Sequence, residues 1–152
     1  MAQVMHMSKK HYSERHDEMA GRLYRLAIYI LGDGYQAESV MMNTFVEGYA
    51  CLLKSELSFE DTLLKRLVKA CECCKTVRVK KYRDFFDGRF TDKAELLFEL
   101  SKYDITERAV LLLVFIEKCD IESIAHIFEM SENQLRESVS RLCFSLNGRL
   151  SA

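Results

Sequence analysis

Apolar side chains recur at intervals of three and four residues along most of this chain, and that spacing predicts amphipathic helices. Residues 14–31 form the first segment, whose apolar face comprises Met19, Leu23, Leu26, Ala27 and Ile30. After the break "GDGY", residues 36–53 form the second, with an inner face of Ala37, Val40, Met41, Thr44 and Phe45. The third is predicted from Phe59 to about Arg83, with Ser58 as N-cap and with an inner face of Leu63, Leu67, Cys71 and Cys74. Three such helices predict a small bundle.

A second group of helices is predicted from residue 94 onward. A short helix covers residues 94–100, and the most apolar helix of the chain covers residues 109–117. Asp120 is the predicted N-cap of the next helix, whose apolar positions are Ile121, Ile124, Ala125 and Phe128. Ser131 and Gln134 form a capping box for the last helix, whose inner face comprises Leu135, Val139, Leu142 and Leu146. The turn "EMS" between these two helices has the length of a helix-turn-helix turn.

The segment between the two groups, "RDFFDGRFTDK", is the predicted linker. Its three aromatic residues, Phe85, Phe86 and Phe90, indicate that it packs on the two halves or on a partner. We therefore predict an all-α protein of two small helical domains, residues 1–83 and 101–152, joined by a linker at 84–100. The second domain is predicted to be a helix-turn-helix domain.

The composition favours helices in a soluble globular protein. The chain has no proline, and most of its six glycines lie at segment ends. An apolar share of 49% and a charged share of 30% are typical of globular proteins. No apolar run approaches the ~18 residues of a membrane span, and the N-terminus has no apolar core of signal-peptide length. We therefore expect a cytoplasmic protein without a membrane partner.

The sequence offers few arrangements suited to metal or catalytic chemistry. The cluster "CECC" (Cys71, Cys73 and Cys74) is too tight for the CxxC pairs of a structural zinc site. The first three histidines are five residues apart and share no helix face. Free buried thiols in a reducing cytoplasm are the preferred interpretation, and a redox or metal sensor built on the three cysteines is the alternative. Without paired carboxylates, a nucleophile constellation or a phosphate loop, the prediction is a non-enzyme with no metal or cofactor.

The net charge of −1 conceals an uneven distribution of charge. Residues 65–83 carry a net charge of +7, whereas the residues before and after them carry −3 and −5. The basic residues of this stretch are Lys65, Arg66, Lys69, Lys75, Arg78, Lys80, Lys81 and Arg83. A concentration of positive charge on one predicted helix indicates an anionic partner, and the alternative is an ordinary solvated helix face.

Three stretches of the chain carry a resemblance to one protein family. They are "LYRLAIYILGDGYQAESVMMNTFVEGY", "LLKRLVKACECCKTVRVKKYR" and "ITERAVLLLVFIEKCDIESIAHIFEMSENQLRESVSRLCFSL". Over roughly residues 17–150 the chain resembles the extracytoplasmic-function sigma factors of bacterial RNA polymerase. The third stretch, with its "IA" pair and the glutamate before the short turn, is the most specific. The resemblance implies two helical domains that bind core polymerase and promoter DNA.

The resemblance implies that the second helix binds the clamp of the polymerase beta-prime subunit. The family's "DAEDxxQETF" pattern stands here as "QAESVMMNTF". On this basis the expected polymerase contacts are Gln36, Glu38 and Asn43. The sequence departs from the pattern at Ser39, Met42 and Asn43, which replace an acid, a glutamine and a glutamate. The alternative is that Val40, Met41 and Phe45 make this segment merely a core element.

The resemblance also implies two DNA-binding surfaces. The basic third helix matches the family's DNA-melting helix, although its usual tryptophan is missing and Ala70 stands where asparagine is usual. The last helix matches the recognition helix, and its expected DNA contacts are Asn133, Gln134, Arg136 and Arg141. Ser138 stands where a basic residue is common, and Glu132 and Glu137 cancel the charge of the two arginines. Because phosphate neutralisation drives most affinity, we expect the recognition helix to contribute little of it.

The leading hypothesis is a divergent sigma-like transcription initiation factor that binds core RNA polymerase and promoter DNA. An anti-sigma protein is a further partner that the resemblance suggests. The alternative is a degenerate sigma-fold protein that acts as a regulator through protein–protein contacts. The altered clamp residues and the acidic second half favour the alternative, and the basic third helix opposes it.

Overall fold

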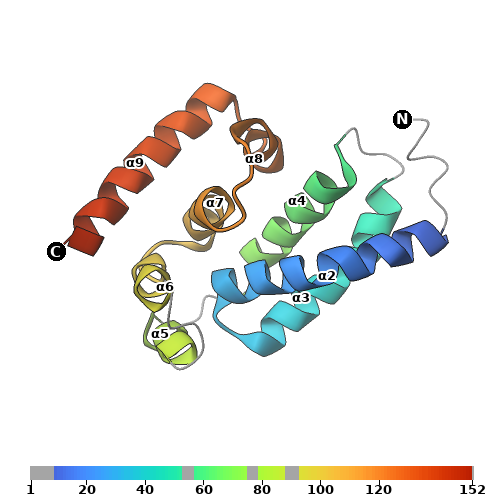
Figure 1. The fold of residues 1–152 in the computed structure, drawn as a ribbon, viewed down its shortest axis with the longest axis horizontal. Coiled ribbons are helices and arrows are strands. Elements are labelled where there is room, and N and C mark those ends of the chain that lie inside the picture. Colours follow the sequence, from blue (N-terminus) through green and yellow to red (C-terminus); the bar gives the residue numbers. More distant parts are fainter. Residues whose placement is uncertain (1–8, 53–56, 75–78, 88–92, 152) are drawn as a thin grey trace.

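The computed structural model of the chain describes residues 9–52, 57–74, 79–87 and 93–151. Within these ranges every regular element is a helix, so the predicted all-α class is confirmed. The helices are α2 (Lys9–Leu31), α3 (Gly34–Leu52), α4 (Phe59–Glu72), α5 (Val79–Asp87), α6 (Ala94–Leu100), α7 (Ile105–Phe115), α8 (Ile121–Phe128) and α9 (Glu132–Ser151). Figure 1 shows α2, α3 and α4 grouped on one side, α8 and α9 on the other, and α7 between them. None of these helices is both long enough and apolar enough to cross a membrane.

Helices α2, α3 and α4 pack against one another and form the predicted bundle. Their predicted inner faces are confirmed, since Leu23, Ala37 and Leu67 are fully buried and of the predicted positions only Met41 and Cys74 are half-buried. Ser58 is the N-cap of α4, because its hydroxyl accepts a hydrogen bond from a backbone N–H of the first turn.

The prediction of a single helix from residue 59 to about residue 83 is wrong. Helix α4 ends at Glu72, and a new helix, α5, begins at Val79. The N–H of Cys73 donates to the carbonyl of Ala70, three residues back, at 3.2 Å, and this tighter hydrogen bonding closes α4. Helix α5 packs on α6 and does not extend the bundle (Figure 1). The basic stretch is therefore divided between two elements.

A buried aromatic cluster fixes α5 in place. The ring centroid of Phe86 lies 4.9 Å from that of Tyr82 and 5.9 Å from that of Tyr29 on α2. The Tyr82 hydroxyl also donates a hydrogen bond to the Tyr29 carbonyl oxygen. The expectation that Phe85 and Phe86 pack on the protein is confirmed, while Phe90 lies outside the described residues. The segment predicted as a linker thus contains the end of α5 and all of α6.

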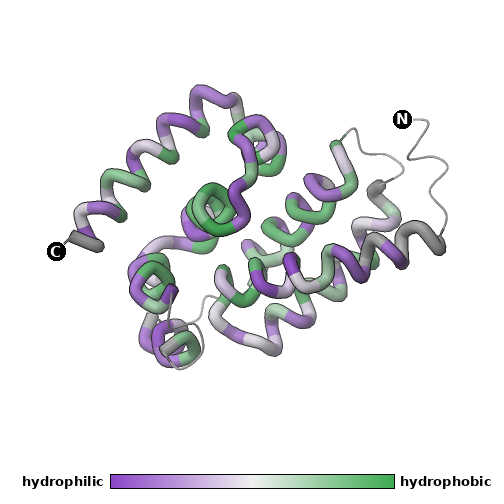
Figure 2. Tube along the Cα trace, viewed as in Figure 1, coloured by the Kyte–Doolittle hydropathy of each residue, from purple (hydrophilic) through white to green (hydrophobic). Residues whose placement is uncertain are grey.

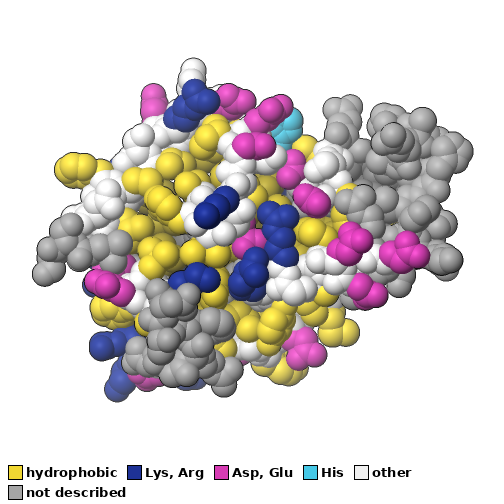
Figure 3. Space-filling model, viewed as in Figure 1, with side chains coloured by type: hydrophobic (Ala, Val, Ile, Leu, Met, Phe, Trp, Pro, Cys, Tyr) yellow, Lys and Arg dark blue, Asp and Glu magenta, His cyan; other side chains and the backbone are white. Residues whose placement is uncertain are grey.

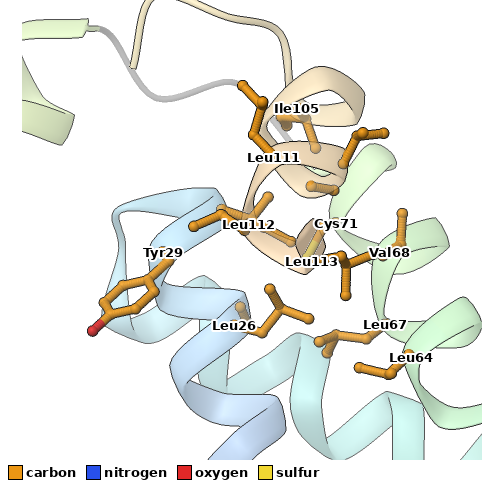
Figure 4. Packing of buried hydrophobic residues seen from close by; sticks show 14 of the residues in the cluster. Leu26, Tyr29, Leu64, Leu67, Val68, Cys71, Ile105, Leu111, Leu112 and Leu113 are labelled. Atoms are coloured by element: carbon orange, nitrogen blue, oxygen red, sulfur yellow. The ribbon is translucent and has the colours of Figure 1, made fainter. Parts of the chain in front are cut away.

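Helix α7 lies at the centre of the molecule and begins at Ile105, four residues before the predicted start, because Asp104 caps it. Leu111, Leu112 and Leu113 are buried, and Figure 4 shows α7 directing leucine side chains towards Leu26 of α2 and Leu67 of α4. Most residues of α7 are hydrophobic, as the colouring in Figure 2 shows. One core cluster includes side chains of α2, α4, α7, α8 and α9, so the two halves share a hydrophobic core.

A buried arginine donates hydrogen bonds to backbone carbonyls where the first half of the chain (α2 to α4) meets the second (α6 to α9). Arg108 is 2% exposed, and its Nη1 donates to the carbonyl oxygen of Ile30 at 2.7 Å. Its Nε and Nη2 donate to the carbonyls of Tyr103 and Ser101 at 3.0 and 3.3 Å. The guanidinium lies 4.7 Å from the Tyr82 ring centroid, which is cation–π distance. Burial lowers the pKa of Arg108, yet an arginine remains protonated at neutral pH.

The caps predicted for the helix-turn-helix are confirmed. The Asp120 carboxylate accepts a hydrogen bond from the N–H of Ser123 at 2.7 Å, which starts α8. Ser131 and Gln134 exchange two hydrogen bonds of 3.1 Å, one in each direction, as a capping box requires. Between the two helices Glu129 adopts the left-handed conformation with φ of 55°, so the turn reverses sharply at that residue. Leu135, Leu142 and Leu146 of α9 face the core.

Candidate nucleic-acid and protein-binding surfaces

Two lysines on successive turns of α4 hold one carboxylate between them. Lys65 and Lys69 are four residues apart, so their side chains lie on the same face of the helix. The Glu129 Oε1 atom lies 2.8 Å from Lys65 Nζ and 3.4 Å from Lys69 Nζ. These hydrogen bonds and the positive charge lower the pKa of Glu129. Two residues predicted to bind DNA are thus ion-paired with the turn of the helix-turn-helix.

A shallow surface groove of about 390 Å³ is lined by residues of both α3 and α4. Its lining includes Arg66 and Lys69, which were predicted to bind DNA, and Asn43, which was predicted to bind polymerase. Glu47 of α3 lies across it, 4.0 Å from the Arg66 guanidinium. The groove therefore brings residues of two separately predicted sites together, with acidic and basic groups facing each other.

The three described basic residues of α5 form a separate surface. Lys80, Lys81 and Arg83 are exposed, and the Arg83 guanidinium lies 4.7 Å from the Phe98 ring centroid. Helix α5 packs on α6 and lies apart from α4 (Figure 1), so these charges are on a different element from Lys65. The remaining two predicted residues, Lys75 and Arg78, lie outside the described residues.

Figure 3 shows Lys and Arg side chains gathered in the middle of one face, over α4 and α7, with acidic side chains at several places around them. Further ion pairs join the first three helices to the second half of the chain. Glu117, whose side chain is 1% exposed, accepts from Arg22 at 2.7 Å and from Arg25 at 3.0 Å. The hydrogen bond and charge of Glu117 raise the pKa of Arg22 despite its partial burial. Much of the basic surface is therefore engaged within the protein.

Helix α9 is the predicted recognition helix, and the four residues predicted to contact DNA lie on its surface. Asn133, Gln134, Arg136 and Arg141 are all exposed. Arg136 is paired with Glu132 on the preceding turn, at 3.7 Å, so their charges cancel locally. The Gln134 side-chain oxygen serves the capping box and leaves its amide N–H groups for other partners. Figure 1 shows α9 along the outer edge of the molecule.

The three predicted polymerase contacts all lie on α3, between its first turn and its middle. Glu38 and Asn43 are exposed and line a shallow pocket of about 350 Å³, together with Tyr35, Ser39 and Met42. Gln36 is turned towards the loop, where its amide donates to Asp33 at 3.0 Å. This bond lowers the pKa of Asp33. Two of the three predicted contacts, Glu38 and Asn43, therefore line the same pocket, whereas the side chain of Gln36 is bound to Asp33 at the start of the helix.

Three charged residues that join the two halves were missed in the sequence, namely Arg108, Glu117 and Glu129. An arginine within the most apolar segment, "ITERAVLLLVF", was an available signal for the first, because a charge there needs buried partners. Glu117 and Glu129 lie among ordinary surface charges in the sequence, and only their distant partners distinguish them.

The thiols differ widely in exposure. Cys71 is fully buried, and burial raises its pKa, whereas Cys73 is exposed. All five cysteines whose side chains the structure describes are free thiols, but the expectation that they are buried holds only for Cys71. Cys73 is exposed, and Cys74, Cys119 and Cys143 are half-buried. Within the described part of the chain, no group of three or more His, Cys, Asp or Glu side chains is placed to hold a metal ion. The side chains of the first three histidines lie outside it.

No protein-family model matches the chain, and no curated protein matches it. The likeness to sigma factors therefore remains a resemblance of motifs.

Proposed function

We propose that this protein is a sigma-like transcription initiation factor that binds core RNA polymerase and promoter DNA and performs no chemistry itself. One observation carries the proposal: a fully capped helix-turn-helix presents the exposed polar face of α9 at the edge of the molecule. A recognition helix enters the major groove with the residues of its first turns. Asn133, Gln134 and Arg136 occupy those turns, and their amide and guanidinium groups suit hydrogen bonding to base edges.

The remaining DNA affinity would come from the basic residues of α4 and α5. Lysine and arginine neutralise phosphates and release counterions, which gives binding that does not depend on sequence. The exposed Lys80 and Lys81 are suited to this role. Core polymerase would bind the face of α3 that carries Glu38 and Asn43. These partners imply a cytoplasmic protein, and an anti-sigma protein would compete for the same surfaces.

The test combines polymerase capture with DNA binding over a salt series. The purified protein should retain core polymerase and should bind promoter fragments, alone or with polymerase. Replacing Lys80 and Lys81 with alanine should weaken binding to all sequences and flatten the salt slope by roughly one unit per lost contact. Arg136→Ala should cost ~1–3 kcal/mol only at sequences where that side chain contacts guanine. Failure to capture polymerase contradicts the proposal, and so does failure to bind DNA at low salt both alone and with polymerase.

A second candidate is a regulator that uses the sigma fold only for protein–protein contacts. The observation that favours it is the shared core, together with the ion pairs that tie Lys65, Lys69 and Arg22 to acids of the other half. Such a protein would capture polymerase or another sigma factor and would not bind DNA under any condition of the salt series. The two candidates therefore differ in the DNA arm of the same experiment.

A further inference from the structure

Lys65 and Lys69 form a two-pronged cationic site on α4, referred to below as the lysine fork. In this structure the fork is filled by a single carboxylate oxygen of Glu129, which lies 2.8 Å from one ammonium nitrogen and 3.4 Å from the other. Both lysines keep part of their side chains in contact with solvent, at 25% and 49% exposure. An anion arriving from solvent can therefore reach the same two nitrogens.

The fork is held at a fixed place relative to the recognition helix. Glu129 is the C-cap of α8, and its backbone N–H donates to carbonyls of that helix. Helix α8 in turn packs against α4. Glu132, the first residue of α9, follows Glu129 by three positions, and three extended residues span at most about 11 Å. The fork thus lies beside the end of α9 that would enter a DNA groove.

The chemistry of the fork suits a phosphodiester. A phosphodiester and a carboxylate both present one negative charge and oxygen acceptors, and a lysine ammonium binds either as a point charge. The recognition helix itself supplies little net charge, because Glu132 pairs with Arg136. A DNA backbone that passes the start of α9 would find in the fork the positive charge that α9 lacks.

We propose that the lysine fork binds a DNA phosphate on the segment contacted by α9, and that Glu129 occupies the fork when DNA is absent. The proposal rests on the proposed function, because it requires DNA binding by the helix-turn-helix. The Glu129 side chain is largely exposed, so it leaves the fork by side-chain rotation while α4 and α8 stay packed. The two halves then act on one DNA segment in the arrangement that the structure has, and Glu129 lowers affinity for every sequence by competing with phosphate.

The test is the effect of Glu129→Gln on binding to a 20-base-pair duplex of arbitrary sequence over a chloride series. Glu122→Gln is the matched control, since Glu122 is an exposed acid on α8, the helix that Glu129 caps, and its change alters the net charge by the same amount. Glu129→Gln should raise affinity by about tenfold at low salt and steepen the salt slope by about one unit, well beyond the control. In a background with both fork lysines changed to alanine, the gain should vanish. Melting temperature should stay close to that of the unaltered protein, because the carboxylate is on the surface.

Each outcome separates the inference from the function. Equal gains for Glu129→Gln and Glu122→Gln, or a gain that persists without the fork lysines, overturn the inference and leave DNA binding intact. If no variant binds the duplex at low salt, either alone or with core polymerase present, both the inference and the DNA-binding function are overturned. Inorganic phosphate, compared with chloride at equal ionic strength, should compete only weakly. Full competition at low phosphate concentration would show a site for free phosphate in place of a DNA site.

Discussion

Arg108 of α7 donates a hydrogen bond to the carbonyl oxygen of Ile30 in the last turn of α2, at 2.7 Å and 78 residues away in the chain. This carbonyl belongs to the end of a helix, where backbone acceptors have no partner within the helix. A charged group from the second half therefore completes the hydrogen bonding of the first. The two halves share polar as well as apolar contacts, so we expect them to unfold together.

The first prediction concerns this arginine. Arg108→Met keeps an apolar side chain but removes the guanidinium N–H donors. The buried carbonyls of Ile30, Tyr103 and Ser101 then lose their hydrogen bonds from this side chain. The free energy of unfolding should fall by about 2–4 kcal/mol in a urea titration. Arg136→Ala, at an exposed arginine of α9, is the control and should change it by less than about 0.5 kcal/mol. Two separate unfolding transitions in the unaltered protein would contradict a shared core.

The second prediction compares two glycines. Gly32 follows α2 with φ of 65°, and a Cβ at that position would overlap the Tyr82 ring. Gly32→Ala should therefore lower the free energy of unfolding by about 1–3 kcal/mol. Gly21 lies within α2, where an added Cβ meets no atom within 4 Å. Gly21→Ala should raise stability by about 0.5–1 kcal/mol because alanine is the better helix former. The check is the melting temperature of each variant. If both substitutions change it in the same direction, this account of Gly32 is contradicted.

The third prediction concerns thiol reactivity. The thiolate is the reactive form, and burial raises the pKa of Cys71 well above its ordinary value. Cys71 should therefore remain unmodified by iodoacetamide at mildly alkaline pH, while the exposed Cys73 is alkylated. Denaturation in urea should make both reactive. Tandem mass spectrometry of the tryptic peptide "ACECCK" distinguishes the positions. Modification of Cys71 in the folded protein at the rate of Cys73 would be inconsistent with the packing of α4.

The fourth prediction tests the polymerase surface. Glu38 is exposed on α3 beside Asn43. Glu38→Lys reverses a charge at the proposed interface and should weaken capture of the beta-prime clamp fragment roughly tenfold without unfolding the protein. Glu95→Lys on α6 makes the same change of charge at an exposed site outside that face and serves as the control. Unchanged affinity of the Glu38 variant would remove α3 as the polymerase-binding element.

The sequence predicted which residues of the candidate surfaces are exposed, but it did not predict which of them lie close together in the fold. Exposure of Glu38, Arg136 and Arg141 agrees with their positions outside the apolar faces of their helices. The division of the basic stretch between α4 and α5 did not, because Tyr82 and Phe86 continue a plausible helical pattern and are buried against Tyr29, 53 residues before Tyr82. The pairing of Lys65 with Glu129 joins residues 64 positions apart, and neither has a distinctive local neighbourhood.

The sequence by itself determined the helical segments of the two halves, their inner faces and the caps at Ser58, Asp120 and Ser131. These features depend on interactions within a few residues, since a cap bonds its own first turn and an amphipathic face follows from the helical repeat. Only the tertiary structure decided where the third helix ends, that Arg108 serves the carbonyl of Ile30, and that Glu129 fills the lysine fork. Those outcomes depend on which residues, far apart in the sequence, come into contact when α7 packs between α2 and α4. The pattern of polar and apolar positions along the chain does not specify these contacts.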